Sequence, residues 1–483
     1  MKVAVIGSGA SAFGVVSKLL SLNKNIKIYI FDNSIIKNYG NNDFPEYLKK
    51  SKKNIFSQIR KNSTLTFPPQ KTFYGITPIK AFNKLYDSKY YGGQTIFWGG
   101  TMYPFDKNEF LKWPIEYSDL TNYYDFISKL VPITSNSKDH KNNNFFANSN
   151  KIELTQSMKN LKKSLHYNDE NLSYSASEPC LAMNFNNKPH PNCEFPGECI
   201  SDCNNHGIYK TIDYFNKIID EKNVFYSNGD VLSIEYNKKI INLNNNSSCN
   251  FDKIYICAGA INSAKILMQS FDINEDIYLN DSALIQFPIF DLNSGYEKTD
   301  LFSHTNLLLS IKEKKDNSLT QFQIYPSYKY LFDYYLSYLP INIDSLIPFN
   351  SLKRLIWFRG YSNNNEANKY KIYKTKGNLF DIEDVKINLT PDLIRICNII
   401  KNNLKLDKFI TIKSFNTYSR TSAHYGCTFP FKGGYFNTPV NGEIVRDIFL
   451  CDSSTFNTLP STSPTFTIMA NAARIAELSL NKF

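Results

Sequence analysis

The stretch VAVIGSGASA, residues 3–12, decides the fold of this 483-residue chain. Its pattern predicts a short buried strand, a glycine turn and the start of a helix. Gly7 permits the tight turn, and Gly9 lets the backbone approach phosphates. Ala12 stands where a third glycine is usual and still allows close packing of helix and strand. Because a helix N-terminus offers N–H groups to an anion, the stretch predicts a site for a dinucleotide pyrophosphate.

The residues that follow complete a nucleotide-binding unit. Phe13, Val16 and Leu19 recur at helical spacing, and residues 26–31 predict a second strand. That strand leads to Asp32, whose carboxylate is placed to accept hydrogen bonds from a ribose hydroxyl. A glycine turn without a ligand is the alternative, but the complete order favours a bound dinucleotide. NAD and FAD both stay open at this point.

Length and composition indicate a globular protein of two or three domains. Hydrophobic residues make up 42% and charged residues 20% of the chain. The net charge of +11 comes from lysines scattered among asparagines, which favours a solvated surface over a nucleic-acid partner. The sequence contains no helix-turn-helix signal, zinc-finger spacing or arginine-rich stripe.

The sequence predicts no membrane-spanning helix and no signal peptide. It contains no apolar run of about 18 residues, and its first residues predict a strand. We therefore expect a cytoplasmic location. The aromatic stretch 328–361 predicts the core of a second domain, with contact to a membrane surface as the alternative.

The predicted elements indicate a discontinuous first domain. We assign residues 1–125, 205–280 and 420–483 to it, with further strands near 224–226, 231–236 and 254–257. Residues 126–204 form a connecting region, and residues 281–419 form a substrate-binding domain with strands near 307–311 and 321–325. Asn-rich stretches predict loops at 142–150, 242–250 and 363–368.

Further motifs lie far from the first one. Residues 91–100, YGGQTIFWGG, form a second glycine-rich loop, and residues 257–267, CAGAINSAKIL, predict another strand–glycine–helix junction. Residues 424–428 read HYGCT, residues 450–454 read LCDSS, and residues 464–470 read PTFTIMA before a helix that continues through Arg474.

Together these motifs resemble the glucose–methanol–choline family of FAD-dependent oxidoreductases. The resemblance covers about half of the chain in the family's order, and residues 113–124 resemble its sugar dehydrogenase branch. It implies an α/β fold, α+β overall, with a Rossmann-like FAD-binding domain and a β-sheet-based substrate domain.

The family's FAD contacts can be carried over to this sequence. The implied contacts are Gly7, Gly9, Ser11, Ala12, Asp32, Gly93, Thr95, Trp98, Gly99, Gly100, Val231, Ala258, Gly259, Asp452, Pro464 and Thr465. Some members attach FAD covalently through a histidine near the second glycine loop. This chain has no histidine before residue 140, so we expect non-covalent FAD.

The resemblance also implies catalytic residues. A substrate alcohol would give its hydroxyl proton to a base and its hydride to the flavin, and imidazole suits the base. His424 matches the family's His-x-x-Gly-Thr motif, although Cys427 replaces the glycine. Ser463 stands where the family usually has a second His or Asn, so we assign it an assisting role.

A cysteine cluster is the other strong signal. Cys193, Cys199 and Cys203 have the spacing C-x5-C-x3-C, and Cys180 is a candidate fourth ligand. Such a loop can hold an iron–sulfur cluster, while zinc, disulfides or free thiols are the alternatives. The spacing resembles the loop that holds a [3Fe–4S] cluster in bacterial sugar dehydrogenases, although Asn204 replaces the usual proline.

These features lead to one preferred function and two alternatives. We expect an FAD-dependent dehydrogenase that oxidises an alcohol group of a sugar-like substrate and passes electrons through a cluster to a protein partner. One alternative is a dehydrogenase for a lipid or isoprenoid-linked alcohol at a membrane surface. The other is a flavin electron carrier or binding module without catalysis.

Overall fold

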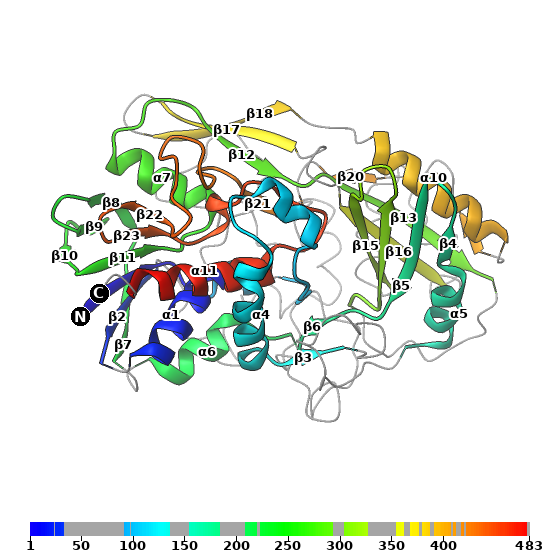
Figure 1. Cartoon of the computed structure of the whole chain (residues 1–483), viewed down its shortest axis with the longest axis horizontal. Coiled ribbons are helices and arrows are strands. Elements are labelled where there is room, and N and C mark those ends of the chain that lie inside the picture. Colours follow the sequence, from blue (N-terminus) through cyan, green and yellow to red (C-terminus); the bar gives the residue numbers. More distant parts are fainter. Residues whose placement is uncertain are drawn as a thin grey trace, which may run out of the picture.

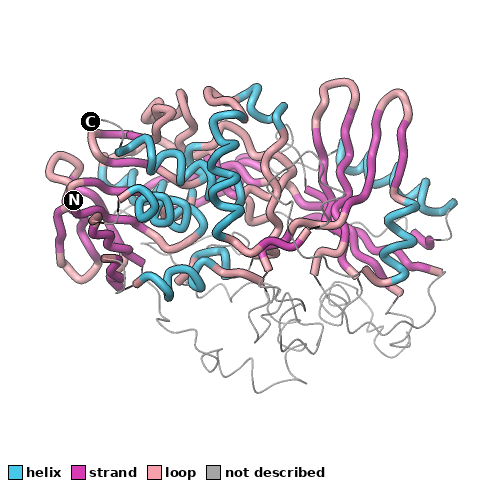
Figure 2. Tube along the Cα trace, turned by 60° about the horizontal axis from the view of Figure 1, so that its bottom comes forward, coloured by secondary structure: helices cyan, strands magenta, loops and turns pink. Residues whose placement is uncertain are grey.

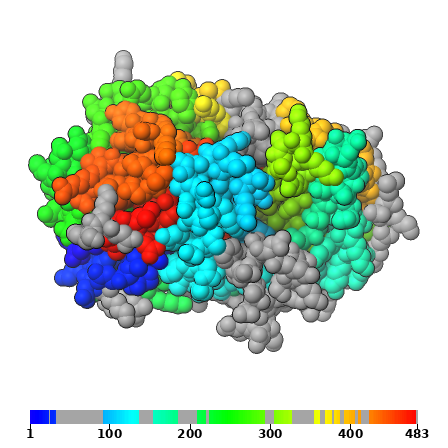
Figure 3. All heavy atoms as spheres, viewed as in Figure 1, coloured from blue at the N-terminus to red at the C-terminus, as the bar shows by residue number. Residues whose placement is uncertain are grey.

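The protein has a parallel sheet with helices at one end and a large antiparallel sheet at the other (Figure 1). Both termini lie at the parallel-sheet end, and the segment around α4 (Ser118–Leu130) fills the middle of one face (Figure 3). The computed structural model describes residues 1–23, 25–32, 91–96, 98–135, 154–183, 208–219, 223–292, 304–326, 354–361, 368–375, 379–386, 391–406, 409–411, 417–419 and 422–480.

The parallel sheet draws its strands from segments far apart in sequence. Its order is β22-β23-β11-β1-β2-β7, and every neighbouring pair is parallel except β22–β23. Its strands are β1 (Lys2–Ile6), β2 (Lys27–Asp32), β7 (Val224–Asn228), β11 (Lys253–Ile256), β22 (Glu443–Val445) and β23 (Ile448–Leu450). All three segments assigned to the first domain therefore contribute a strand, while the domain boundaries themselves stay predictions.

Both faces of this sheet are covered, which explains the unbroken apolar run of β1. Val3 and Val5 face one core, with α1 (Ala10–Leu22), α4, α6 (Thr211–Ile218) and α11 (Thr465–Leu480). Ala4 and Ile6 face a second core with α7 (Ala260–Ser270). A small sheet of β8 (Val231–Glu235), β9 (Ile240–Leu243) and β10 (Ser248–Asn250) completes this second side. The loop prediction for 242–250 is therefore wrong at its ends, because a turn of polar residues joins two strands there.

Gly14 lets α1 and α11 pack closely. A Cβ atom at Gly14 would lie 2.2 Å from the carbonyl oxygen of Met469, which belongs to the backbone of α11. We expect Gly14→Ala to lower the free energy of unfolding by about 1–3 kcal/mol, because the helices must separate to admit the methyl group. Urea unfolding followed by circular dichroism measures this. Gly433→Ala is the control, since its Cβ would be in ordinary contact at 3.4 Å, and equal loss in both variants would contradict the packing argument.

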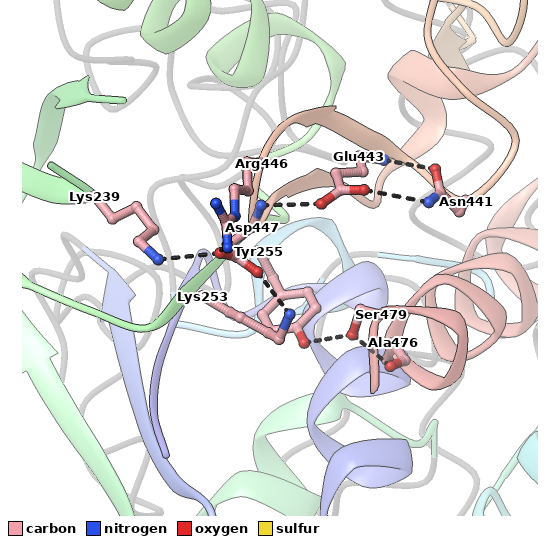
Figure 4. Close-up of polar contacts among 9 residues, drawn as sticks. All are labelled: Lys239, Lys253, Tyr255, Asn441, Glu443, Arg446, Asp447, Ala476 and Ser479. Atoms are coloured by element: carbon pink, nitrogen blue, oxygen red, sulfur yellow. Dashed lines mark hydrogen bonds and ion pairs between the residues drawn. The ribbon is translucent and has the colours of Figure 1, made fainter. Parts of the chain in front are cut away.

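Ion pairs fix the last strands to the edge of the parallel sheet (Figure 4). Asp447, in the turn between β22 and β23, accepts hydrogen bonds from Lys253 at 2.8 Å and Lys239 at 3.1 Å. Burial raises the pKa of Asp447, but the two lysines outweigh it and hold the pKa below its usual value. Tyr255 on β11 hydrogen-bonds Ser479 on α11 at 2.6 Å. These contacts join the C-terminal segment to the strand beside β1.

The large antiparallel sheet forms the other end of the molecule, where Figure 2 shows its long strands. One face packs on the apolar stripe of α10 (Pro391–Leu406) and on α5 (Gln156–Ser164). The order is β19-β13-β16-β15-β14-β5-β4, with β20 also on β13. Its strands are β4 (His166–Asn168), β5 (Leu172–Ser177), β13 (Leu284–Asp291), β14 (Leu307–Glu313), β15 (Leu319–Tyr325), β16 (Leu355–Tyr361), β19 (Phe409–Thr411) and β20 (Thr417–Ser419).

The aromatic stretch 328–361 is core in its described part. Trp357 and Phe358 lie on β16, and both side chains are buried. This supports the interpretation as core for residues 354–361, while residues 328–353 lie outside the described ranges. No helix in the described part of the chain is long and apolar enough to span a membrane.

Two smaller sheets connect the ends. One has the order β18-β17-β12-β21 and the other pairs β3 with β6. Their strands are β3 (Ile133–Thr134), β6 (Leu181–Ala182), β12 (Ile277–Asp281), β17 (Asn368–Lys374), β18 (Phe380–Lys386) and β21 (Tyr425–Gly426). Since β12 and β21 lie next to each other, residues near 281 and 424 are brought together.

Candidate active site

Three turns leave the carboxyl edge of the parallel sheet side by side. β1 leads into Gly7, β11 leads into Gly259, and β23 leads into Asp452. The sheet order reverses here, because β2 lies on one side of β1 and β11 on the other. Such a switch point is where open α/β sheets bind their ligands. The predicted dinucleotide turn therefore occupies the expected binding edge.

Gly7 and Gly9 serve different purposes. Gly7 has a φ of +105°, and a Cβ there would lie 2.5 Å from the carbonyl oxygen of Cys257. At Gly9 a Cβ would be in ordinary contact, 3.8 Å from the Cα of Gly93. The fold therefore requires glycine at residue 7, whereas the space beside Gly9 suits the backbone approach to phosphates that the sequence predicts. The same contact shows that the first and second glycine loops touch.

Ser8 joins both loops to the predicted ribose-binding acid. Its hydroxyl donates to the carboxylate of Asp32, and it accepts the N–H of Gly92 at 2.7 Å. Asp32 ends β2 and is half-buried. Because the Ser8 hydroxyl both donates and accepts a hydrogen bond, it holds Asp32 at the edge of the first loop.

Two threonines, Thr95 and Thr211, hold the backbone of the second glycine loop. Thr95 lies in the short helix η2 (Gly93–Ile96), is buried, and donates to the carbonyl of Gly92 at 2.6 Å. The backbone N–H of Thr211 donates to the Thr95 hydroxyl at 3.2 Å, and the Thr211 hydroxyl donates to the carbonyl of Ser8 at 3.0 Å. Thr95 therefore supports the backbone of the loop. The sequence predicted Thr95 as a cofactor contact and could not tell that role from this structural one.

The first turn of α1 offers unsatisfied polar groups. The hydroxyl of Ser11 is buried and has no hydrogen-bond partner among the described residues. Ala12 is fully buried against the sheet, as its small size predicts. An orphaned hydroxyl next to the N–H groups that open a helix fits a phosphate ligand. This edge therefore fits the pyrophosphate of a dinucleotide.

Val231 lies near the outer end of the same edge. The N–H of Gly229 donates to the carbonyl of Asp32 at 3.1 Å, and Val231 starts β8 two residues later. The side chain of Val231 is buried, so its backbone is the part that can meet a ligand. Val231 therefore lies two residues from a backbone contact with Asp32, and its role in cofactor binding stays a prediction.

The end of the second loop packs toward the antiparallel sheet. Trp98 donates its indole N–H to the carbonyl of Tyr209 at 2.7 Å. Gly100 has a φ of +68° and accepts a hydrogen bond from Ala182 at 2.6 Å. Gly99 touches the ring of His304, because a Cβ at Gly99 would lie 2.7 Å from Cε1 of that ring. The predicted flavin-binding segment therefore contacts three residues from the middle of the chain, Ala182, Tyr209 and His304.

Cys180 lies beside this loop. Its side chain is buried, its carbonyl accepts the N–H of Met102 at 2.8 Å, and its N–H donates to the Tyr103 hydroxyl at 2.9 Å. Met183 and Ile208, which flank the cysteine-rich segment, form an antiparallel bridge beside Trp98.

The other predicted metal ligands lie outside the described residues; these are Cys193, Cys199 and Cys203. Within the residues that the structure describes, no group of three or more His, Cys, Asp or Glu side chains could hold a metal ion. The cysteine prediction therefore stays a prediction.

Asp452 joins two of the edge turns. Its buried carboxylate accepts the N–H of Gly259 at 2.9 Å, the N–H of Ser454 at 2.9 Å, and the hydroxyl of Ser263. Burial raises its pKa above the usual value, although these donors act against that shift. Gly259 has a φ of +80° with open space around it, and Ala258 precedes it beside Gly7. Asp452 thus organises the turns, and its contact with a cofactor stays a prediction.

The start of α11 holds the last predicted cofactor contacts. Pro464 is buried and its carbonyl accepts the N–H of Ile468 at 2.8 Å, while Thr465 is partly exposed. Ser463 precedes them and is partly exposed too. Within the described part of the chain no hydrogen bond joins Ser463 to His424. The assisting role of Ser463 concerns the substrate oxygen and stays a prediction.

A buried acid positions His424. Asp281, at the end of β12, accepts the hydroxyl and the N–H of Ser422 at 2.6 and 2.9 Å. It also accepts the backbone N–H of His424 at 3.0 Å. Asp281 is fully buried, and its strand β12 pairs with β21, where Asp281 lies opposite Tyr425. Its carboxylate therefore fixes the loop that carries His424. Sequence reasoning missed Asp281.

The imidazole of His424 is held as a neutral ring. It stacks on Tyr361 with ring centroids 4.7 Å apart, and its Nδ1 has no hydrogen-bond partner among the described residues. Burial lowers its pKa to about 3, and the positive charge of Arg359 adds to this effect. A neutral imidazole with a free nitrogen can accept a proton from a substrate hydroxyl.

The charge of Arg359 acts on a second histidine as well. Burial lowers the pKa of His304 to about 3, and Arg359 contributes again. His304 is buried and stands just before β14, while Arg359 and Tyr361 lie on β16. Sequence reasoning missed His304 and Arg359. The one signal available was a polar triplet, residues 304–306, directly before an apolar strand.

The neutral histidines predict loss of stability in acid. Between pH 6.5 and about 3 the unfolded chain binds protons at residue 304 that the folded chain does not, so the free energy of unfolding falls as pH falls. For His304 the effect is on the order of a few kcal/mol. We expect His304→Gln to flatten the fall between pH 6.5 and 4 in urea titrations. Exposed His166→Gln is the control, and an unchanged slope in His304→Gln would contradict this prediction.

Cys427 occupies a glycine-like conformation. Its φ is +65°, in the position where the resembled motif has glycine. A β-branched residue is strained in this region, so we expect Cys427→Val to lower the free energy of unfolding by about 1–3 kcal/mol. Cys427→Gly should stay within about 1 kcal/mol of the parent, because glycine adopts this φ freely. Urea unfolding compares them, and a valine variant as stable as the glycine variant would refute the strain.

Comparison with known proteins places this geometry in a fold. Pyridoxine 4-oxidase from Mesorbium loti aligns with a TM-score of 0.64 and 11% identity, over 99% of this chain and 98% of that one. An FAD-dependent oxidoreductase from Chaetomium thermophilum, solved with a bound fragment, aligns with a TM-score of 0.59 and 11% identity over the same shares. The chain has the fold of an FAD-dependent oxidoreductase. The predicted fold class is confirmed.

Sequence comparison adds nothing to this assignment. No family model matches the chain, and no curated protein matches it. Because the two similar structures share the fold at only 11% identity, the cofactor and the activity of this chain have to be argued from the residues of its own site.

Proposed function

We propose that this chain binds FAD non-covalently and oxidises an alcohol by hydride transfer. The observation that carries the proposal is the direct contact between the two glycine loops at the switch point, at Gly9 and Gly93. Ser8 joins both loops to Asp32. A doubly wound sheet that binds NAD needs only the first loop, whereas a second loop suits a flat ring system beyond the pyrophosphate.

The chain's own residues fit the parts of FAD. Asp32 would receive the adenosine ribose, and the N–H groups of the first turn of α1 with Ser11 would receive the pyrophosphate. The segment of Trp98 and Gly99 would lie against the flavin, and the Asp452 turn would meet the ribityl chain. When bound, FAD supplies an acceptor for one hydride, which carries two electrons.

His424 would perform the proton transfer. As the carbon–hydrogen bond of the alcohol breaks and the hydride leaves, the hydroxyl proton passes to the neutral imidazole, and a carbonyl forms. Asp281 holds the backbone of His424, and Tyr361 holds its ring. The positive charge of Arg359 favours the negative charge that develops on the oxygen. Atoms balance, because one proton and one hydride leave the substrate.

The polar face of the antiparallel sheet supports a sugar-like substrate. Arg359 on β16 is paired with Gln286 on β13 and with Gln323 on β15, so these side chains form one row. Both amides are buried, and Tyr325 donates to Gln323 at 2.5 Å. Amides and a guanidinium can bind several hydroxyl groups. A lipid alcohol offers this buried polar row only one hydroxyl group, whereas a sugar offers several.

The test is flavin content followed by anaerobic reduction. The purified full chain should release FAD on denaturation, and its flavin spectrum should bleach with at least one member of a panel of glucose, sorbitol, choline, benzyl alcohol and pyridoxine. Protein that neither retains nor rebinds FAD would overturn the proposal. Bound FAD that no panel alcohol reduces, but dithionite does, would favour the electron carrier.

We also propose that Cys193, Cys199 and Cys203, with Cys180 as a candidate fourth ligand, hold an iron–sulfur cluster that passes electrons to a protein partner. The support is the position of Cys180 beside the second glycine loop. Anaerobically purified protein should contain iron and sulfide, and Cys193→Ser and Cys203→Ser should lose both. Bound zinc without iron, or no metal, would refute this assignment while leaving the FAD proposal intact.

A further inference from the structure

Tyr91 opens the second glycine loop and carries a buried hydroxyl group. The residue is only 5% exposed, and within the described part of the chain its hydroxyl oxygen has no hydrogen-bond partner. A buried hydroxyl without a partner costs free energy, so its presence in a folded protein needs an explanation. Sequence reasoning assigned cofactor contacts to Gly93 and Thr95 in the same loop but no role to Tyr91.

Two aromatic neighbours hold the ring of Tyr91. It packs edge-to-face with Tyr226 on β7, with ring centroids 5.0 Å apart, and its centroid lies 6.2 Å from that of Phe215 on α6. Burial raises the pKa of Tyr91, and Tyr226 and the charge of Asp32 add to this rise, so the hydroxyl stays protonated. Tyr91 is therefore a fixed, neutral phenol that can donate one hydrogen bond and accept others.

Hydrogen bonds connect Tyr91 to the predicted ribose-binding acid by two routes. The N–H of Gly92, the next residue, donates at 2.7 Å to the Ser8 hydroxyl, which itself donates to the carboxylate of Asp32. Tyr226, which packs on the Tyr91 ring, donates its hydroxyl to the carbonyl of Asp32 at 3.3 Å. The backbone and the ring of Tyr91 are therefore both held beside Asp32.

The first glycine turn contributes a second buried hydroxyl of the same kind. Ser11 lies in the first turn of α1, and its hydroxyl too has no partner among the described residues. The two glycine loops touch, because a Cβ at Gly9 would lie 3.8 Å from the Cα of Gly93. Each loop thus leads to one unsatisfied hydroxyl. This pair suits a ligand with two polar parts, a phosphate at the start of α1 and a sugar beside Asp32.

We infer that the hydroxyl of Tyr91 hydrogen-bonds a ribose hydroxyl in the adenosine half of FAD, next to the hydroxyl that Asp32 receives. This rests on the proposed function and deepens it, because it adds a binding residue that the sequence motifs do not contain. A ribose carries two adjacent hydroxyl groups, so Asp32 and Tyr91 can bind one each. A nucleotide that lacks either hydroxyl therefore binds more weakly, since a buried group of the protein stays without its partner.

Tyr91→Phe tests this inference by separating FAD affinity from stability. Fluorescence titration of the full-length apoprotein should show FAD binding about tenfold weaker, while the urea midpoint of the apoprotein should not fall, because the lost hydroxyl has no partner within the protein. Tyr255→Phe is the matched control. Its buried hydroxyl bonds to Ser479 at 2.6 Å, so this variant should lower the urea midpoint and keep FAD affinity within about twofold. Unchanged FAD affinity in Tyr91→Phe, or a urea midpoint as low as that of Tyr255→Phe, would overturn the inference.

Competition with ADP, 2′-deoxy-ADP and 3′-deoxy-ADP identifies the hydroxyl that Tyr91 contacts. In displacement of FAD from the full chain, ADP should bind the parent about tenfold more tightly than it binds Tyr91→Phe. One of the two deoxy analogues should bind both proteins equally within about twofold, because it lacks the contacted hydroxyl. An equal tenfold difference for all three nucleotides would place the contact on the adenine or the phosphates and overturn the inference. A parent protein that binds no FAD would refute the proposed function itself.

Discussion

Gly7→Ala is expected to lower the free energy of unfolding by about 2–5 kcal/mol. The φ of +105° disfavours any residue with a Cβ, and that atom would lie 2.5 Å from the carbonyl oxygen of Cys257. This oxygen is backbone, and the N–H of Cys257 bonds to Ile6, so the clash is relieved only by separating β1 from β11. Urea unfolding followed by circular dichroism measures the loss.

Gly9→Ala is the matched variant for Gly7→Ala. Its Cβ would be 3.8 Å from the Cα of Gly93, and its backbone is extended with a φ of −79°. We expect a stability within about 1 kcal/mol of the parent, but FAD affinity at least tenfold weaker, because the methyl group occupies the space for the pyrophosphate. Fluorescence titration of apoprotein with FAD measures this. A Gly7→Ala protein as stable as Gly9→Ala would contradict the account of both turns.

His424→Ala is expected to slow flavin reduction by the best panel alcohol about 1,000-fold. General-base catalysis contributes 100- to 10,000-fold in enzymes, and this variant leaves the hydroxyl proton without an acceptor. FAD content should not change, since the contacts predicted for FAD lie on other loops. Stopped-flow anaerobic reduction and flavin quantification give both values.

The pH profile of kcat/KM provides a second check on His424. Because burial and Arg359 lower its pKa to about 3, the ring stays neutral and competent as a base from pH 8 down to pH 5. The parent should therefore show no acid limb near pH 6.5 that His424→Ala removes. Such a limb would contradict the lowered pKa of His424, whereas a variant as fast as the parent would exclude His424 as the base of this reaction.

Many strands of both large sheets were predictable from short stretches of sequence. The strands predicted at 3–6, 26–31 and 254–257 correspond within one residue to β1, β2 and β11 of the parallel sheet, and residues 307–311 and 321–325 lie in strands of the antiparallel sheet. These elements are encoded locally, since apolar runs select strands and periodic spacing selects helices. The Asn-rich stretch at 242–250 was harder, because strand pairing with β8 overrode its polar composition.

The candidate site was predictable only in part. The glycine turns, Asp32, Asp452 and His424 stood out because each belongs to a motif of a few adjacent residues. Asp281, His304 and Arg359 belong to no such motif, and they lie between 65 and 143 residues away from His424 in sequence. Their meeting depends on which strands pair and in what register.

The sequence by itself determined the shape of the edge at which a nucleotide is predicted to bind: a turn that only glycine can make at residue 7, a helix that starts at residue 10, and an acid at residue 32. Each depends on φ, hydrogen-bond patterns and apolar periodicity over a few residues, which the local sequence controls. The tertiary structure alone decided that the charge of Arg359 acts on both His304 and His424. Side chains from separate sheets are brought near one another by long-range packing, and their spacing along the chain does not predict this proximity.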